Sequence, residues 1–251
     1  MKLKNNKIFM RHILSAAFKY SVPVLLGYLV IGFAFGLIMS DAGYPIWLTA
    51  AMSVLMYTGA GQYIAVGLFA AGASLWEAAL VQLVVSARHI AYGLSMIKRM
   101  PFSGLRKIYC IFGLTDETFA LLSSLPEANG ETLNVSGLKN PIPAGSIGSF
   151  MFHVTLLNQS YWVIGSLAGA AAGSLLSYNI EGVSFALTAL FIVLMLEQII
   201  KIRKPGIFFV SAISAILCVV FLPSRFSLLA AIAFALAINS ILRRKMARNE
   251  N

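Results

Sequence analysis

Stretches of apolar residues long enough to cross a lipid bilayer follow one another through almost the whole chain. A membrane-spanning helix needs about 20 such residues, and we expect seven or eight spans between residues 16 and 242. The apolar stretches are 16–39, 46–71, 75–97, 108–125, 145–176, 183–200, 207–222 and 226–242. The chain has 251 residues, of which 59% are hydrophobic and 11% are charged, whereas soluble domains carry about 25% charged residues. The sequence therefore predicts an all-α, polytopic membrane protein with seven or eight transmembrane helices and no separate soluble domain.

Basic residues mark the borders of the predicted helix bundle, residues 16–242. A basic segment at 1–15 precedes the bundle and a basic tail at 243–251 follows it. Lys and Arg at the ends of apolar stretches are typical of cytoplasmic loops. We therefore expect a multi-pass protein in the lipid bilayer of the cell membrane, with a cytoplasmic N-terminus. The net charge of +10 does not indicate a nucleic-acid partner, because the basic residues form no patch on a folded domain.

The number of crossings is open at two long apolar stretches, 46–71 and 145–176. The second would form a helix of about 48 Å against a hydrocarbon core of about 30 Å, so it must tilt, protrude or break, with 158–160 as the break point. If every stretch crosses once, 13 basic residues face the cytoplasm and 5 face outward, with loop 98–107 as the exception. If 46–71 re-enters and 145–176 crosses twice, that loop also becomes cytoplasmic.

The stretch 46–71 contains the strongest candidate for a broken helix. Gly59 and Gly61 enclose an alanine, and Thr58 and Gln62 stand on either side of them. Unwound backbone at membrane depth is tolerated where it lines a cavity or is buried in protein, and transporters bind substrates at such breaks. The segment is either such a break, facing a transport path, or a notch for close helix packing.

Glycines four residues apart predict close contacts between helices. Such pairs occur at Gly32 and Gly36 and again at Gly169 and Gly173. Each pair is followed by another glycine and an apolar stretch, so the sequence also indicates a weak internal repeat.

An arginine and a histidine, Arg88 and His89, lie in the middle of the apolar stretch 75–97. A charge at the centre of a bilayer costs about 2.5–3.5 kcal/mol on insertion scales, so Arg88 needs partners. Asp116 and Glu117 are the only acids well inside the apolar stretches, and we expect one of them to pair with Arg88. The alternatives are a functional cluster and a purely structural ion pair. For His89, packing with a hydrogen bond is the favoured interpretation.

Helical spacing gathers further polar residues beside Arg88. Ser86 and His89 share one stripe of the predicted helix, and Tyr92 lies on the flank next to it. The polar half of this helix must face protein or water, which makes it the best candidate for a functional surface.

Several classes of function lack their sequence signals. The three histidines are far apart and no His-Glu-x-x-His motif is present, so an enzyme is not expected, and the sequence shows no metal or cofactor cluster. The charge rings and carbonyl filters of channels are also missing. A secondary transporter accounts for the broken helix, the buried cation and the two buried acids. An assembly protein of the membrane is the alternative.

Three motifs resemble those of the AzlC family of branched-chain amino acid permeases. They are Tyr57-Thr-Gly-Ala-Gly-Gln62, Arg88-His89 with Tyr92-Gly93, and Leu114-Thr-Asp-Glu-Thr118. Ser86 departs from the pattern, since many members have asparagine there. The resemblance implies transport, as export, of leucine, isoleucine, valine and analogues such as azaleucine. It also implies a small hydrophobic membrane subunit of the AzlD type; another small zwitterion is the alternative substrate.

The residues fit such a substrate. A zwitterion needs a cation or a helix N-terminus for its carboxylate, which Arg88 or the amides near Gly59 and Gly61 can supply. It needs an acid for its ammonium group, which Asp116 or Glu117 can supply, and the same acids can carry a coupling proton. The expected site also includes the neighbouring polar residues Thr58, Gln62, Ser86, His89 and Tyr92.

Overall fold

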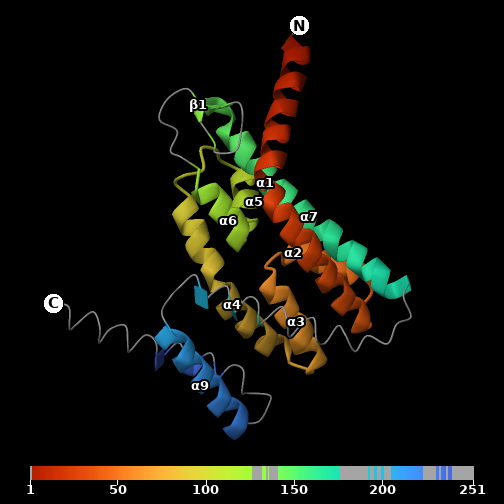
Figure 1. The fold of residues 1–251 in the computed structure, drawn as a ribbon, viewed down its shortest axis with the longest axis vertical. Coiled ribbons are helices and arrows are strands. Elements are labelled where there is room, and N and C mark those ends of the chain that lie inside the picture. Colours follow the sequence, from red (N-terminus) through yellow and green to blue (C-terminus); the bar gives the residue numbers. More distant parts are fainter. Residues whose placement is uncertain are drawn as a thin grey trace, which may run out of the picture. The chain divides into compact units, whose positions relative to one another are not determined.

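The computed structural model describes residues 2–125, 132–133, 135, 141–175, 192, 195–196, 199–200, 205–222, 230–231, 233–235 and 237–238. Its elements are α1 (Lys2–Asp41), α2 (Ile46–Leu55), α3 (Ala60–Ala70), α4 (Leu75–Met96), α5 (Leu105–Phe112), α6 (Asp116–Ser123), β1 (Thr132–Leu133), β2 (Ile142–Pro143), the short 3-10 helix η1 (Ala144–Ser146), α7 (Ile147–Leu175) and α9 (Pro205–Phe221) (Figure 1). The expected span at 183–200 and the expected span at 226–242 lie largely outside the described residues. The candidate site lies in one compact unit, Met1–Ala70 with Gln82–Ser184, while Ala71–Val81 and Phe185–Asn251 form a second.

Helix α1 is the longest element and continues beyond the span expected at 16–39. Its segment Arg11–Asp41 is the one helix among the described residues that is long and apolar enough to cross a bilayer by itself, with 31 residues and a mean hydropathy of 2.3 over an 18-residue window. Helices α2 and α3 are shorter apolar helices. The division of the chain at residue 15 stays a prediction, although α1 begins at Lys2.

Helices α1 and α7 pack side by side along a glycine-lined crossing (Figure 1). A Cβ atom on Gly32 would lie 2.9 Å from the Trp162 carbonyl oxygen, and one on Gly169 would collide with the Phe33 carbonyl group. Side chains larger than hydrogen would therefore force the two backbones apart. The predicted packing role of these glycines is confirmed, and their neighbour is a helix of the same chain.

Helices α2 and α3 form a hairpin that returns to the end at which it starts. The ring centroids of Tyr44, before α2, and Phe69, near the end of α3, are 6.0 Å apart. The two helices have 10 and 11 residues, about 15 Å each, too short to cross a 30 Å core. The stretch 46–71 therefore has the geometry of a re-entrant pair, one of the alternatives left open by the sequence.

Helices α5 and α6 form a second hairpin where the sequence predicted one span, 108–125. The chain breaks at Gly113–Thr115, where Thr115 has extended backbone angles of φ −78° and ψ 174°. Arg99, in the segment that joins α4 to α5, donates hydrogen bonds to the carbonyl oxygens of Ser123 (2.8 Å) and Leu125 (3.0 Å) at the end of α6. The single span was therefore wrong, because Thr115 caps a new helix instead of continuing the old one.

The two hairpins start from opposite ends of α1. Tyr20, in the first half of α1, donates a hydrogen bond to the Leu121 carbonyl oxygen at the end of α6 (2.9 Å). The α2–α3 hairpin begins just after Asp41, the last residue of α1. The 21 residues from Tyr20 to Asp41 span about 30 Å of helix, the thickness of a hydrocarbon core.

Helix α7 is continuous over 29 residues, so the break expected at 158–160 is wrong. Its polar side chains find hydrogen-bond partners while the backbone stays helical. Asn158 donates to Thr118 (3.0 Å), Gln159 donates to the Val54 carbonyl oxygen (3.0 Å), and Ser160 donates to the Leu156 carbonyl oxygen (2.7 Å). A long helix that tilts or protrudes is what remains of the predicted alternatives.

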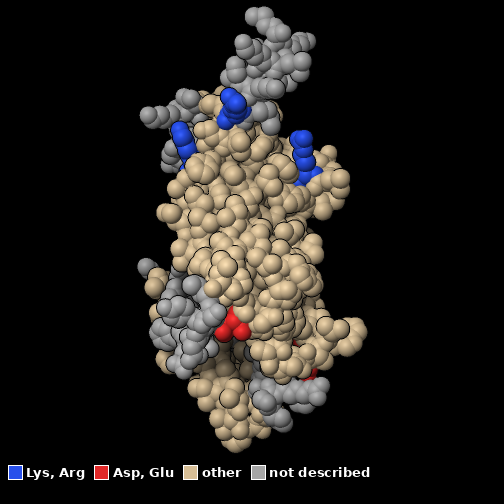
Figure 2. Space-filling view, turned by 90° about the vertical axis from the view of Figure 1, so that its right-hand side faces the viewer, with Lys and Arg blue, Asp and Glu red and all other residues tan. Residues whose placement is uncertain are grey.

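Basic side chains lie at one end of the first unit. Apart from Arg88, the described Lys and Arg side chains belong to residues 11–19 and 98–107, and both segments lie where Tyr20 and Arg99 contact the end of α6. In Figure 2 the visible Lys and Arg side chains lie toward this end, above a broad uncharged surface. Loop 98–107 thus lies at the same end as the start of α1. The first count of crossings, which placed this loop on the opposite side, was wrong. The second count placed the loop at this end because the stretch 46–71 re-enters, and the α2–α3 hairpin has that geometry in the structure.

Candidate functional site

The acids of the site stand at the start of helix α6. The Thr115 hydroxyl accepts a hydrogen bond from the Thr118 backbone N–H (3.3 Å), which caps the helix. Asp116 and Glu117 occupy the first turn, where the positive end of the helix dipole stabilises negative charge. The sequence predicted both acids inside an apolar helix, where burying their charges would be costly. The break before them puts them at a helix start instead, which explains why they are tolerated.

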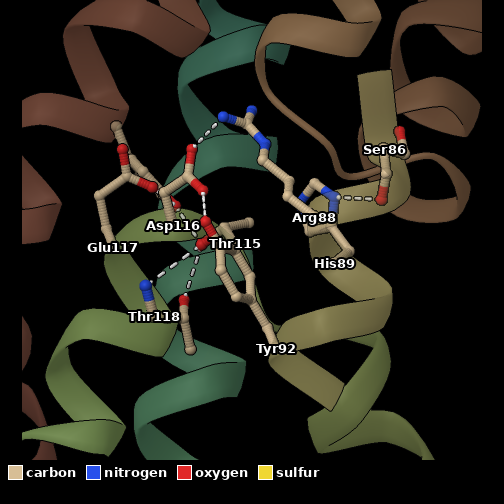
Figure 3. A network of polar contacts seen from close by, with 9 residues as sticks. Ser86, Arg88, His89, Tyr92, Thr115, Asp116, Glu117 and Thr118 are labelled. Atoms are coloured by element: carbon tan, nitrogen blue, oxygen red, sulfur yellow. Dashed lines mark hydrogen bonds and ion pairs between the residues drawn. The ribbon is translucent and has the colours of Figure 1, made fainter. Parts of the chain in front are cut away.

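Arg88 of α4 pairs with Asp116, as predicted. Its Nη1 atom lies 2.8 Å from Asp116 Oδ2, and 34% and 31% of the two side chains are accessible. The other carboxylate oxygen, Oδ1, accepts a hydrogen bond of 2.6 Å from the Tyr92 hydroxyl. The Tyr92 ring stacks on Phe119 of α6 with centroids 4.3 Å apart. Figure 3 shows Arg88 and Tyr92 reaching Asp116 from the same helix. The pair is partly accessible rather than fully buried.

Glu117 belongs to a different set of contacts. The Tyr28 hydroxyl of α1 donates to Glu117 Oε2 at 2.7 Å, and the same hydroxyl lies within hydrogen-bonding distance of Thr115 Oγ1. Glu117 points away from Arg88 in Figure 3. Tyr28 thereby ties the start of α6 to the middle of α1, a contact that the sequence analysis did not anticipate because Tyr28 lies in an apolar, glycine-containing stretch.

The break between α2 and α3 lies at residues 56–59, slightly before the predicted segment. Tyr57 and Gly59 have positive φ angles of 28° and 57°, values that side-chain-bearing residues rarely adopt. Gln62 already belongs to the first turn of α3. The interruption that the sequence predicted is therefore present, with its centre shifted by about two residues.

Gln82 of α4 holds the break in place. Its Nε2 atom donates to Thr58 Oγ1 (3.2 Å) and to Ser86 Oγ (3.0 Å). A Cβ atom on Gly61 would collide with this amide and with the Thr58 hydroxyl, so Gly61 is small because Gln82 packs against it. Ser86 thus contacts Gln82 rather than Arg88.

His89 lies beside the ion pair without joining it by a hydrogen bond. Its Nδ1 atom lies 3.2 Å from the Ser86 carbonyl oxygen of its own helix, and its ring meets the Tyr92 ring edge-on at 5.8 Å. These contacts agree with a half-buried packing histidine. The described residues contain no group of three or more His, Cys, Asp or Glu that could hold a metal ion.

Two neighbouring amides of α7 connect the hairpins. Asn158 donates to Thr118 in α6. Gln159 donates to the Val54 carbonyl oxygen near the end of α2 and accepts a 2.6 Å hydrogen bond from the Tyr109 hydroxyl of α5. From the sequence, these amides were interpreted as the break point at 158–160. Their signal was the presence of two adjacent amides in an otherwise apolar helix.

A mostly helical chain with an apolar spanning helix and two opposed hairpins that both contact α4 has the architecture of an α-helical membrane protein. A family model described as "AzlC protein" matches residues 23–176, more than half of the chain. The chain belongs to the AzlC family.

Among its relatives, the "Branched-chain amino acid transport protein AzlC" of Bacillus subtilis is 36% identical over 190 residues, covering 75% of this chain and 69% of the relative. An "Uncharacterized membrane protein" of Helicobacter pylori is 34% identical over 230 residues, covering 92% of this chain and 95% of the relative. The "Inner membrane protein YgaZ" of Escherichia coli is 31% identical over 188 residues, covering 72% of this chain and 71% of the relative. No solved structure matches the chain.

Proposed function

We propose that the chain exports branched-chain amino acids across the cell membrane by a secondary, proton-coupled mechanism, together with a small hydrophobic AzlD-type subunit. The name of the Bacillus subtilis relative, a branched-chain amino acid transport protein, supports the substrate class. The resemblance of the three motifs supports the direction and the subunit.

The observation that carries the proposal is that the breaks of both hairpins contact the same helix, α4. The α2–α3 break reaches α4 through the contact between Thr58 and Gln82, and the start of α6 reaches α4 through the pair of Arg88 and Asp116. Broken helices at membrane depth supply free backbone groups to bound substrates and ions in secondary transporters. A protein with a purely structural role has no need for two such breaks at the same place.

The ion pair offers both charges that a zwitterion needs. Arg88 uses Nη1 on Asp116, while its buried Nε atom has no hydrogen-bond partner. A substrate carboxylate can bind the guanidinium and a substrate ammonium group can bind Asp116. The amino acid then replaces one ion pair with two, so no charge is left unpaired as it passes.

Glu117 is the residue that we assign to proton coupling. It is exposed, and its carboxylate accepts a hydrogen bond from Tyr28 rather than from Arg88. A proton can therefore bind Glu117 without dissolving the pair between Arg88 and Asp116. The basic end of the unit is assigned to the cytoplasm by the excess of Lys and Arg, which also places the N-terminus there.

The proposal is tested in cells that lack their own exporters and express the chain with an AzlD-type subunit. We expect resistance to azaleucine and a smaller valine load after feeding with valine dipeptides, both lost with Arg88→Ala. Full resistance with the chain alone would contradict the role of the subunit. A rise of intracellular valine would contradict export while keeping the substrate class. Protection against other amino acids only would favour a different zwitterion.

A further inference from the structure

Buried polar atoms without hydrogen-bond partners are concentrated around the α2–α3 break. Among the described residues they include both amide atoms of Gln62, the Tyr57 hydroxyl, Trp162 Nε1 and Asn158 Oδ1. The exposed fractions of Gln62 and Asn158 are 0%, and that of Trp162 is 3%. Buried polar groups in folded proteins almost always have a partner. A whole set of unpaired groups at one place therefore offers hydrogen bonds to a bound polar molecule.

These groups come from the break itself, from the first turn of α3 and from α7. The tip of the Trp162 ring lies 4.0 Å from the position of a Cβ atom on Gly59. The Tyr28 ring lies 5.5 Å from the Trp162 ring and 6.4 Å from the Tyr57 ring, both edge-on. Asn158 lies one helical turn before Trp162 on α7 and contacts the start of α6 through Thr118. The unpaired atoms thus lie on the segments through which the two hairpins approach each other.

The start of α3 is the available positive helix end. Its first turn contains no acidic side chain, whereas the first turn of α6 holds its own two acids. The first backbone N–H groups of a helix have no acceptor within the helix, and the dipole favours an anion there. On the other side of the break, the carbonyl oxygens at the end of α2 favour a cation. A broken helix therefore offers complementary partial charges to a molecule that carries both signs.

We propose that these groups form the binding site for the head group of the transported amino acid, an inference that rests on the proposed function and assigns it a place. The Trp162 indole N–H, Gln62 Nε2 and the first amides of α3 bind the α-carboxylate. Asn158 Oδ1 and Gln62 Oε1 accept hydrogen bonds from the α-ammonium group. The rings of Tyr28 and Trp162 contact the branched side chain.

The assignment separates two stations on the route of the substrate. The pair of Arg88 and Asp116 is about one-third accessible and carries full charges, as suits the capture of a hydrated zwitterion. The groups around Gln62 are buried and uncharged, as suits the dehydrated substrate, whose net charge is zero.

Two conservative variants test the site. Trp162→Phe removes the indole N–H while keeping an aromatic ring, and Gln62→Met removes the amide while keeping the volume. Trp76→Phe is the matched control, because Trp76 is 81% exposed. Thermal unfolding of the full-length chain, purified together with an AzlD-type subunit, is measured with increasing leucine concentrations. Wild-type protein and the control are expected to gain stability with the same dependence on leucine.

Both site variants should unfold at the wild-type temperature or above it without leucine, because they remove buried groups that have no partner. They should require about tenfold more leucine for the same stabilisation, the effect of one lost hydrogen bond. Wild-type dependence on leucine in both variants would overturn the site and leave the proposed function intact. Lower stability with unchanged leucine dependence would show a structural role and also overturn it. A wild-type protein that does not respond to leucine, isoleucine or valine would overturn the proposed function together with the site.

Discussion

Replacing Arg88 and Asp116 by alanine, singly and together, measures how strongly α4 and α6 are coupled. The two charged atoms are 2.8 Å apart and about one-third of each side chain is accessible. Exposed ion pairs contribute about 0.2–1 kcal/mol, whereas removing one partner of a buried pair costs about 3–5 kcal/mol. A pair of intermediate accessibility is therefore expected to show a coupling free energy of about 1–2 kcal/mol.

The two single changes should differ in size. Asp116→Ala also removes the 2.6 Å hydrogen bond from Tyr92, and hydrogen bonds to charged groups contribute about 1.5–3 kcal/mol. Arg88→Ala leaves that hydrogen bond in place, so it should destabilise the protein less. Both single changes should abolish transport, and the double variant should be expressed better than either of them.

The assay is the free energy of unfolding of the purified variants in detergent, combined in a double-mutant cycle. Glu117 supplies the matched control cycle, because it neighbours Asp116 but contacts Tyr28 instead of Arg88. Changes at Arg88 and Glu117 should add within about 0.5 kcal/mol. If the changes at Arg88 and Asp116 were equally additive, the proposed coupling of α4 to α6 through this pair would be refuted.

Three further changes test the packing and the break. Gly36→Leu should cost about 3 kcal/mol or more in unfolding free energy, because its side chain would meet the backbone of α7, whereas Gly27→Ala, with nothing within 4 Å, should be neutral or stabilising; equal losses would contradict the close crossing. Thr115→Ala should cost about 1 kcal/mol through the lost helix cap, measured by the same unfolding assay, and no loss would contradict the separate start of α6. Thr58→Cys should react with water-soluble maleimide more slowly when leucine or valine is present, because bound substrate covers the break. The two native cysteines are buried and should not react; an unreactive Thr58→Cys variant would favour the packing notch.

Hydrophobic patterning predicted the elements whose boundaries depend on local sequence. The stretch 75–97 became α4, Leu75–Met96, and the glycines near residue 59 became a break. The pair of Arg88 and Asp116 followed from the scarcity of charges at membrane depth, although the choice between Asp116 and Glu117 did not. The cost of burying Arg88 requires an acidic partner at the same depth. Asp116 and Glu117 are neighbours on one helix turn, so either meets that requirement equally well.

The elements that were missed depend on tertiary contacts. The second hairpin was interpreted as one span because its apolar length is adequate; only the cap formed by Thr115 reveals a new helix start. Asn158 was interpreted as a break because its partner, Thr118, lies 40 residues earlier in the chain. Tyr28 gave no signal, since a tyrosine in an apolar helix acquires its role only when α6 is packed beside it. The internal repeat stays a prediction.

Flux of labelled leucine into inside-out membrane vesicles tests the central claim most directly. Vesicles that contain the chain and an AzlD-type subunit should accumulate leucine when their lumen is acidified, and isoleucine and valine should compete with it. Arg88→Ala should abolish this uptake, while Trp76→Phe should leave it unchanged. Absence of leucine, isoleucine and valine flux in either vesicle orientation, or wild-type flux in Arg88→Ala, would contradict the account.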